Sequence, residues 1–192
     1  PPVPESECVT VLQGMKQEAP DGVKVSYAMG SGFSEADEHE KAKAMALAEE
    51  SDVIVAVVGG SSSRFGGAVF DANGAASKGT GSRSMDCGEG MDTAKVHIPA
   101  AQEELIAALA RLGKPLVTVV IAGRAYCIEK IENASDAVLY AFYPGPMGGR
   151  AVAELLYGSS NPSGRLPVSM PRHVGQIPVC YNYRTSVAPA YC

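Results

Sequence analysis

Two short apolar runs constrain the fold of this chain more than any other feature. Val53–Val58 reads VIVAVV and precedes Gly59 and Gly60, and a second run extends from Pro115 to Ile121. Neither run can cross a bilayer, because a spanning helix needs about 20 apolar residues. A continuous apolar run of this length is typical of a strand that is buried on both faces, as in a parallel sheet.

Patterns with helical spacing separate the apolar runs. Val9, Leu12 and Met15 recur at such a spacing, and Ser34, three residues before Asp37, is the predicted start of an Ala-rich helix. In chain order we expect a helix around Val9–Met15, a strand at Val23–Tyr27, a helix from Ser34 to about Glu50, strands at 53–58, 115–121 and 137–142, and helices at 99–112, 126–133 and 148–157. This alternation predicts an α/β fold, with a doubly wound, mostly parallel sheet sandwiched by helices.

A long segment without regular spacing follows the first apolar run. From Ser61 to Gly88 the chain is rich in Gly, Ser and Ala. We predict that residues 60–88 form an insertion loop within a single domain spanning residues 1–192, because 192 residues suit one core. Ligands of open α/β sheets bind at the carboxyl ends of the strands, and the loop leaves from that edge.

The overall charge limits the partners. The formal net charge is −5 and the chain has no run of Lys and Arg, which argues against nucleic acid and anionic membranes, since both attract a positive surface. We expect no membrane span, because no apolar run reaches the required length. The five cysteines show no CxxC or Cys/His spacing, so we expect no metal, and no motif calls for a cofactor.

A possible glycosylation site indicates the compartment. Asn133-Ala-Ser135 fits the acceptor rule for N-glycosylation. We therefore predict a secreted glycoprotein that resides outside the cell or in the secretory pathway. The N-terminal residues have neither the basic nor the apolar part of a signal peptide, so any such signal has already been removed.

Two glycine-containing turns leave nucleotide binding as one alternative. Gly30–Glu35 lies between a predicted strand and a predicted helix, but Glu35 stands where a dinucleotide fingerprint needs its third glycine. Gly145–Gly149 lacks the Lys and Ser/Thr of a phosphate loop, and we interpret it as a tight turn that allows close packing. A nucleotide-binding module thus has only the sheet type in its favour.

Glu89 and Asp92 stand out because of their neighbours. Glu89 lies between two glycines in the stretch CGEGMD, just after the long loop and before a helix. Flanking glycines let the backbone bring a carboxylate close to a ligand. From the local chemistry alone, a solvent-exposed acidic turn is the competing interpretation.

Several longer motifs decide between these readings. Glu89–Gln102 resembles the run EGxDRxxLxLPxxQ of glycoside hydrolase family 3, the family of β-glucosidases and β-xylosidases. Tyr143–Gly158, Asn161–Pro167 and Met170–Arg172 resemble its later run WYPGxxGGxAxAxxLFGxxNPSGxLPxTxPR. These motifs cover most of the chain in the same order, so the sequence is identified as the C-terminal α/β sandwich domain of that family.

The resemblance implies a catalytic role for Glu89. In this family a retaining reaction uses an Asp nucleophile on a TIM-like barrel and a general acid/base Glu on a loop of the sandwich domain; Glu89 is the matching position, with Asp92 as a possible supporting residue. Retaining glycosidases need two carboxyl groups about 5 Å apart. Burial in the joint pocket would keep such an acid protonated, because desolvation raises the pKa of a carboxyl group.

The chain departs from the family pattern at several points. Thr93 replaces the Arg that follows the Asp, and Gly60 stands where the family often has a Glu. The barrel and the first strand of the sandwich are absent from the sequence, so we expect a companion chain or a removed segment to supply both, and we expect the chain to be neither stable nor active alone.

Two functions follow from these observations. The chain is either part of an exo-acting β-glycosidase that hydrolyses O-glycosyl bonds of a β-linked saccharide, with Glu89 as proton donor, or a non-catalytic structural or carbohydrate-associated component of an extracellular assembly.

Overall fold

The molecule is built around a sheet of three parallel strands. The computed structural model describes residues 4–62, 69–70, 73, 76–77, 86–88 and 92–182. The strands are β1 (Ile54–Gly59), β4 (Leu116–Ile121) and β5 (Ala137–Tyr140), in the order β1-β4-β5. β4 and β5 lie within predicted strands, and β1 matches the strand predicted at 53–58 but ends one residue later. Their parallel pairing confirms the predicted class of sheet.

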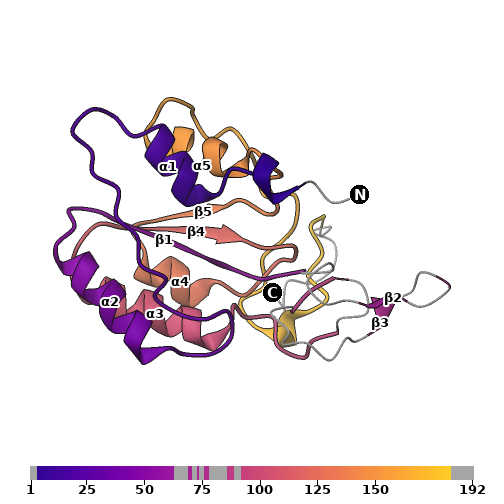
Figure 1. Ribbon diagram of the computed structural model, residues 1–192. Coiled ribbons are helices and arrows are strands. Elements are labelled where there is room, and N and C mark those ends of the chain that lie inside the picture. The colour runs from indigo at the N-terminus through magenta and orange to yellow at the C-terminus, as the bar shows by residue number, and fades with distance from the viewer. Residues whose placement is uncertain are drawn as a thin grey trace.

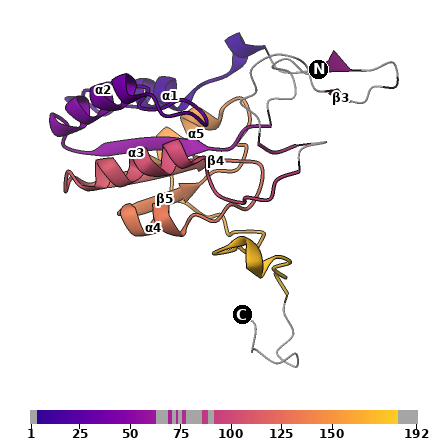
Figure 2. The same ribbon diagram turned by 90° about the horizontal axis from the view of Figure 1, so that it is seen from below.

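The described helices cover both faces of this sheet (Figure 1). On one face lie α1 (Val11–Gln17) and α5 (Gly148–Leu156), and on the other lie α2 (Glu38–Glu49), α3 (Ala100–Ala110) and α4 (Glu129–Ala134). Two 3-10 turns, η1 (Glu5–Glu7) and η2 (Val174–Gln176), flank this layered body. In Figure 2, β4 lies beside β5, and β1, drawn in purple, lies on the side nearest α2. The arrangement is the predicted helix–sheet–helix sandwich.

β4 forms the centre of the core. Thr118, Val119 and Val120 have no exposed surface. Leu105 and Ile106 of α3, which the sequence places on one helical face, pack into the same buried cluster. The Thr118 hydroxyl lies 2.7 Å from the Ser135 hydroxyl, which satisfies the polar group that this strand carries into the core.

Two glycines allow α1 and α5 to pack closely. A Cβ atom on Gly14 would lie 2.2 Å from the carbonyl oxygen of Gly149, and one on Gly149 would lie 2.2 Å from the backbone of Thr10. The Gly149 N–H donates to the Val9 carbonyl at 3.1 Å. Gly149, the last glycine of the Gly145–Gly149 stretch, therefore serves close packing, as the sequence predicted.

The strand predicted at Val23–Tyr27 is absent from the structure. This segment forms no strand, and Val23 and Tyr27 are 47% and 64% exposed. The prediction failed because a strand exists only when another strand pairs with it, and among the described strands β1 pairs with β4 alone. β1 is consequently an edge strand.

Helix starts also differ from the predicted ones. α2 begins at Glu38 and is capped by Asp37, whose carboxylate accepts from the N–H groups of His39 and Glu40, both at 3.0 Å. Ser34 is therefore not the cap, because the carboxylate of Asp37 satisfies two free N–H groups at once. α4 begins later than expected because Cys127, before it, forms a β-bridge with His97.

In the part of the predicted loop that the structure describes, two very short strands occur. β2 (Val69–Phe70) and β3 (Ala76–Ser77) pair in antiparallel fashion.

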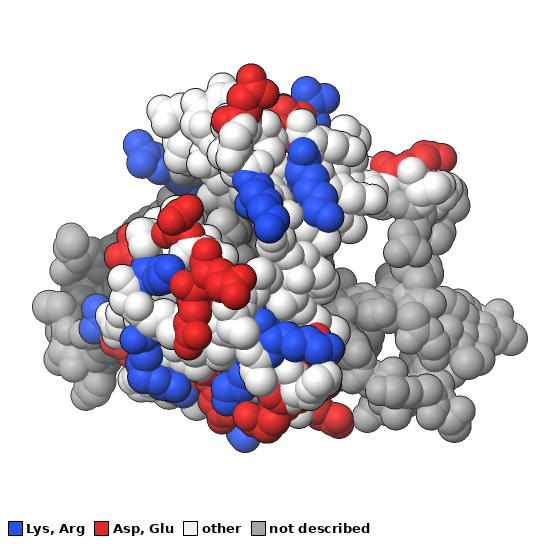
Figure 3. All heavy atoms as spheres, turned by 60° about the vertical axis from the view of Figure 1, so that its left-hand side comes forward, with Lys and Arg blue, Asp and Glu red and all other residues white. Residues whose placement is uncertain are grey.

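Figure 3 shows acidic and basic side chains interspersed over the face that it draws. Among the residues that the structure describes, no helix is both long enough and apolar enough to span a membrane.

Candidate functional site

The two ends of the long loop meet at the carboxyl end of the sheet. β1 ends at Gly59, and the Gly60 N–H still donates to Ile121 of β4 at 3.1 Å. When the chain returns, the N–H groups of Asp86 and Cys87 both donate to the Ser61 carbonyl, at 3.0 and 3.2 Å. These hydrogen bonds therefore join the two ends of the loop, which we call its base, at the carboxyl end of the sheet.

Asp86 ties this base to the strand next to β1. One carboxylate oxygen accepts from the Ser61 N–H at 2.8 Å, and the other accepts from the Tyr126 hydroxyl at 2.6 Å. Tyr126 follows β4 and is only 1% exposed. Burial, and after it the Asp86 carboxylate, raise the pKa of Tyr126 above its ordinary value of 10.0. The phenol therefore stays protonated and remains a hydrogen-bond donor.

Gly60 leaves the space in which this contact forms. A Cβ atom there would lie 2.0 Å from the Tyr126 hydroxyl and 2.9 Å from an Asp86 carboxylate oxygen. Any side chain at this position would displace one of the two groups. The departure from the family pattern at Gly60 thus has a steric reason in this chain.

Cys87 makes a second contact with an aromatic side chain. Its buried sulfur lies 3.2 Å from the hydroxyl of Tyr143, which follows β5. Burial, and after it the hydrogen bond with Cys87, raise the pKa of Tyr143. The ring packs over Gly123, where a Cβ atom would lie 2.6 Å from it, yet it remains 47% exposed. The preceding residue, Phe142, adopts a φ of 50°, an uncommon conformation for a residue with a side chain.

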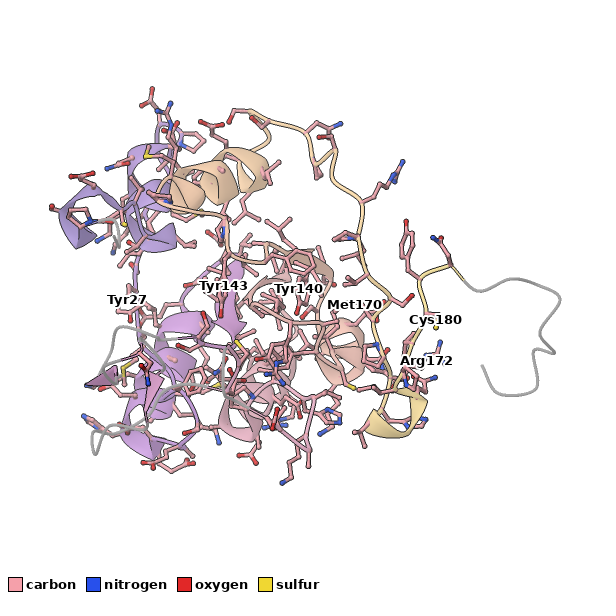
Figure 4. All side chains as sticks on the ribbon, turned by 90° about the vertical axis from the view of Figure 1, so that its right-hand side faces the viewer. Tyr27, Tyr140, Tyr143, Met170, Arg172 and Cys180 are labelled. Atoms are coloured by element: carbon pink, nitrogen blue, oxygen red, sulfur yellow. The ribbon has the colours of Figure 1, made fainter. Side chains whose placement is uncertain are left out.

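A third tyrosine links the ends of β4 and β5. The Tyr140 hydroxyl donates to the Arg124 carbonyl and accepts from the Tyr126 N–H at 3.4 Å. Burial raises the pKa of Tyr140 to about 12. Figure 4 looks onto the carboxyl ends of the strands and shows Tyr140 and Tyr143 there, with Tyr27 beyond them on the side of β1. We call the set Ser61, Asp86, Cys87, Tyr126, Tyr140 and Tyr143 the rim cluster.

Gln102 of α3 supports the rim from below. Its side-chain amide accepts from the Gly59 N–H at 2.8 Å and donates to the Gly59 carbonyl at 3.1 Å and to the Phe33 carbonyl at 2.7 Å. Gln102 is buried, so these bonds satisfy the polar atoms of its amide. Gln102, the last residue of the stretch that resembles EGxDRxxLxLPxxQ, therefore has a structural role at the end of β1.

Of the predicted site residues, Glu89 lies outside the described residues, and its role stays a prediction. Asp92 is exposed and makes no hydrogen bond or ion pair with another described residue. Thr93 forms a local turn, in which its hydroxyl donates to the Lys95 carbonyl at 2.9 Å. Gly88, directly before Glu89, has a φ of 110°, a region that favours glycine.

The predicted glycosylation site lies on α4. Asn133 is exposed and, with Glu129, Glu132 and Arg172, lines a polar pocket of about 260 Å³. Met170 and Arg172, labelled in Figure 4, belong to the C-terminal segment beside it. The hydroxyl of Ser135, the third residue of the acceptor triplet, is bound to Thr118. Glycosylation at Asn133 stays a prediction.

Metal-binding groups and disulfides are absent from the described part of the chain. It contains no cluster of three or more His, Cys, Asp or Glu side chains that could hold a metal ion. Cys8, Cys87, Cys127 and Cys180 are free thiols. The buried carboxylate of Glu103 forms an ion pair with Lys130, at 2.7 Å, and this contact raises the pKa of Lys130.

Sequence reasoning missed the rim cluster. Asp86 stands in a segment without regular spacing, and its partner Tyr126 is 40 residues away. The one available signal was that Tyr126 and Tyr143 each come shortly after a buried strand, at the edge where α/β proteins bind their ligands.

Comparisons with known proteins agree with these observations. Residues 2–191 match the glycosyl hydrolase family 3 C-terminal domain. The chain is 34% identical to a periplasmic β-glucosidase of Salmonella typhimurium over 96% of its length, and 34% identical to a β-xylosidase of Formosa agariphila over 90%. It spans only 24% and 21% of those proteins.

A solved structure extends the likeness to the fold. The crystal structure of a β-glucosidase from Listeria innocua in complex with gluconolactone superposes with a TM-score of 0.74 at 31% identity, covering 94% of this chain and 21% of that one. The match in sequence therefore extends to the parallel sheet and its helices. This chain belongs to glycosyl hydrolase family 3, as a C-terminal domain of that family.

Proposed function

We propose that this chain is part of a retaining, exo-acting β-glycosidase of the β-glucosidase or β-xylosidase type, with Glu89 as its general acid/base. The observation that carries the proposal is the anchored chain at Asp86 and Cys87, directly ahead of Glu89, in a member of a glycoside hydrolase family. Two relatives bear the names β-glucosidase and β-xylosidase, which supports a β-linked saccharide as the substrate.

In the first step of this reaction, Glu89 acts as an acid. A carboxylate from the rest of the enzyme forms a bond to the anomeric carbon while the glycosidic C–O bond breaks, and Glu89 gives its proton to the departing oxygen. In the second step Glu89, now ionised, takes a proton from water, the water oxygen bonds to the anomeric carbon, and the bond to the nucleophile breaks. Two inversions at that carbon retain its configuration.

The rest of the enzyme has to supply the nucleophile. The chain spans 21–24% of the length of the relatives reported above, which supports a further segment or companion chain with a barrel. The same partner supplies a strand for β1. In a parallel ladder the N–H groups of Val55 and Val57 point away from β4, and no other described strand pairs with β1.

Side chains beside β1 suit such an added strand. Val57 is 46% exposed, and the segment after α1 exposes Tyr27 and Met29, at 64% and 49%. Tyr27 lies beyond β1 on its open side (Figure 4). An apolar strand between β1 and this segment would cover these side chains and pair the outward N–H groups of Val55 and Val57.

Replacement of Glu89 tests the catalytic role. In the protein that joins this chain to its barrel, Glu89→Gln should lower kcat/KM for phenyl β-glycosides by about 10²–10⁴-fold, the usual contribution of general acid catalysis. Dinitrophenyl glycosides should keep most of their kcat/KM, because their leaving group needs no proton. In Glu89→Gly, azide should raise the turnover of dinitrophenyl glycosides and yield a β-glycosyl azide.

Glu104→Gln is the matched control for this experiment, because Glu104 is an exposed acid on α3. It should behave as the parent does. Unchanged hydrolysis of phenyl glycosides by Glu89→Gln would remove Glu89 from the mechanism and leave the non-catalytic structural role.

We also propose that the protein works outside the cytoplasm. The acceptor triplet at Asn133 and the periplasmic location in the name of the Salmonella relative support this location. Fractionation of the source cells measures it directly, and recovery of the protein in the cytoplasmic fraction alone would contradict it.

A further inference from the structure

We propose that Asp86 is a positioning residue for the general acid: its carboxylate, bound to Ser61 and Tyr126, fixes the chain three residues before Glu89. This inference assumes the proposed role of Glu89. It goes further by naming the group that holds the acid in place, which none of the recognised motifs contains.

Hydrogen bonds of the backbone and of the Asp86 carboxylate fasten the chain at this point. Two join the N–H groups of Asp86 and Cys87 to the Ser61 carbonyl, and two use the Asp86 carboxylate. A carboxylate has lone pairs on both oxygens, so it accepts from the Ser61 N–H and the Tyr126 hydroxyl at once. An amide in its place would present an N–H₂ group to one of these two donors.

The anchor is fixed to the sheet rather than to another loop. Tyr126 is buried and its N–H is bound to the Tyr140 hydroxyl, so its own hydroxyl has a defined position. Ser61 follows β1 by two residues, and Gly60 between them has no room for a Cβ atom. Asp86 is therefore held in a fixed position relative to β1 and β4.

A second contact restricts rotation about the first. Cys87 is 3% exposed and binds Tyr143 on the β5 side, whereas Asp86 binds Tyr126 on the β4 side. Two successive side chains held by two different tyrosines fix the direction of the chain as well as its position. Gly88 then gives the backbone its turn toward Glu89.

A proton donor needs this kind of support. A displacement of about 1 Å in a reacting group can lower a rate about 10²-fold. Because burial and Asp86 keep the Tyr126 phenol protonated, the contact also persists over the pH range in which a carboxyl acid works.

The test uses the enzyme that contains both this chain and the barrel. Asp86→Asn should lower kcat/KM for phenyl β-glycosides by roughly 10–100-fold, and Tyr126→Phe by roughly 3–10-fold, because the Ser61 contact remains. Both should change kcat/KM for dinitrophenyl glycosides by less than about threefold, since that substrate does not use the proton. The alkaline limb of the pH profile should shift in Asp86→Asn, because activity falls where the general acid loses its proton and the displaced acid has new surroundings.

Two controls separate this effect from a general loss of structure. Asp52→Asn removes an exposed carboxylate, and Tyr157→Phe removes a hydroxyl that donates to the Met15 carbonyl far from the rim. Both should match the parent with both substrates. If Asp86→Asn does not fold, as judged by circular dichroism, Tyr126→Phe decides the question through the same ratio of the two substrates.

The two proposals can fail separately. In a Glu89→Gly background, Asp86→Asn should add less than about a twofold effect, because a positioning residue has nothing left to position. Normal activity of Glu89→Gly with phenyl glycosides would overturn the proposed function. A large effect of Glu89→Gly, combined with an equal loss on both substrates in Asp86→Asn, would overturn only the role of Asp86.

Discussion

β1 and β4 have similar sequences but different surroundings. Both are six-residue, almost wholly apolar strands, and they pair with each other. β4 has a strand on each side and buries Val119 and Val120 completely, whereas β1 pairs with β4 alone among the strands that the structure describes and leaves Val57 46% exposed. Edge strands usually carry charges, prolines or bulges that discourage pairing, and β1 has none of these. A strand with the sequence of an inner strand thus lies at the edge of the described sheet, which agrees with the proposal of an added strand.

The largest difference should appear when each strand loses apolar volume. Leu116→Ala in β4 should lower the free energy of unfolding by about 2–5 kcal/mol, because Leu116 is 1% exposed and a cavity remains. Val57→Ala in β1 should cost less than about 0.5 kcal/mol in this chain. Urea unfolding measures both values. Equal losses would mean that β1 is already covered and would end the comparison.

The enzyme that includes the barrel should reverse the result for β1. Val57→Thr keeps the shape of the side chain but adds a hydroxyl. In this chain it should be nearly neutral, whereas beneath a covering strand the buried hydroxyl should cost about 1–3 kcal/mol. Thermal unfolding of the two forms, with Val55→Thr as a second substitution on β1, measures the difference. A neutral result in both forms would contradict the added strand.

Alkaline pH should weaken the end of the sheet where β4 and β5 carry their tyrosines. Tyr126 and Tyr140 have raised pKa values in the folded chain, so they stay protonated while the unfolded chain loses these protons. The free energy of unfolding should therefore fall as the pH rises above about 10, by at most about 1.4 kcal/mol per pH unit for each tyrosine.

Tyr126→Phe should make this decline less steep, and Tyr181→Phe, an exposed tyrosine, should not change it. Urea unfolding between pH 8 and about 11 gives the slopes. A slope that is the same in the parent and in Tyr126→Phe would exclude Tyr126 as a source of the decline.

The smallest effect concerns α2, which packs against α3 on the side of β1. Asp37→Ala should cost about 1 kcal/mol, because the N–H groups of His39 and Glu40 lose their acceptor. Ser34→Ala should be neutral within about 0.5 kcal/mol. The opposite order in a denaturation experiment would restore Ser34 as the cap.

The sequence was sufficient for elements whose signal is local. The apolar runs at 53–58 and 115–121 predict buried strands because continuous hydrophobicity marks a strand covered on both faces. Val23–Tyr27 has a different local signal, in which apolar and polar residues alternate. That prediction failed because pairing depends on a neighbouring strand that the segment itself does not encode. Position in the sheet is thus not a local property.

The candidate site divides in a similar way. Glu89 was found through a contiguous motif, and its role stays a prediction. Asp86 was not found, because its role depends on a tyrosine 40 residues away and on the missing side chain of Gly60. Contacts of this kind exist only after β1 and β4 have paired.

The amide of Gln102 has a consequence for any strand that joins β1. It forms hydrogen bonds with the N–H and the carbonyl of Gly59, both of which point away from β4. These two groups at the end of β1 are therefore already paired with a side chain. An added strand can form hydrogen bonds only with the outward backbone groups before Gly59, at Val55 and Val57. A shift by one residue would turn every side chain of that strand to the opposite face. Gln102 therefore limits the register in which any added strand can pair with β1.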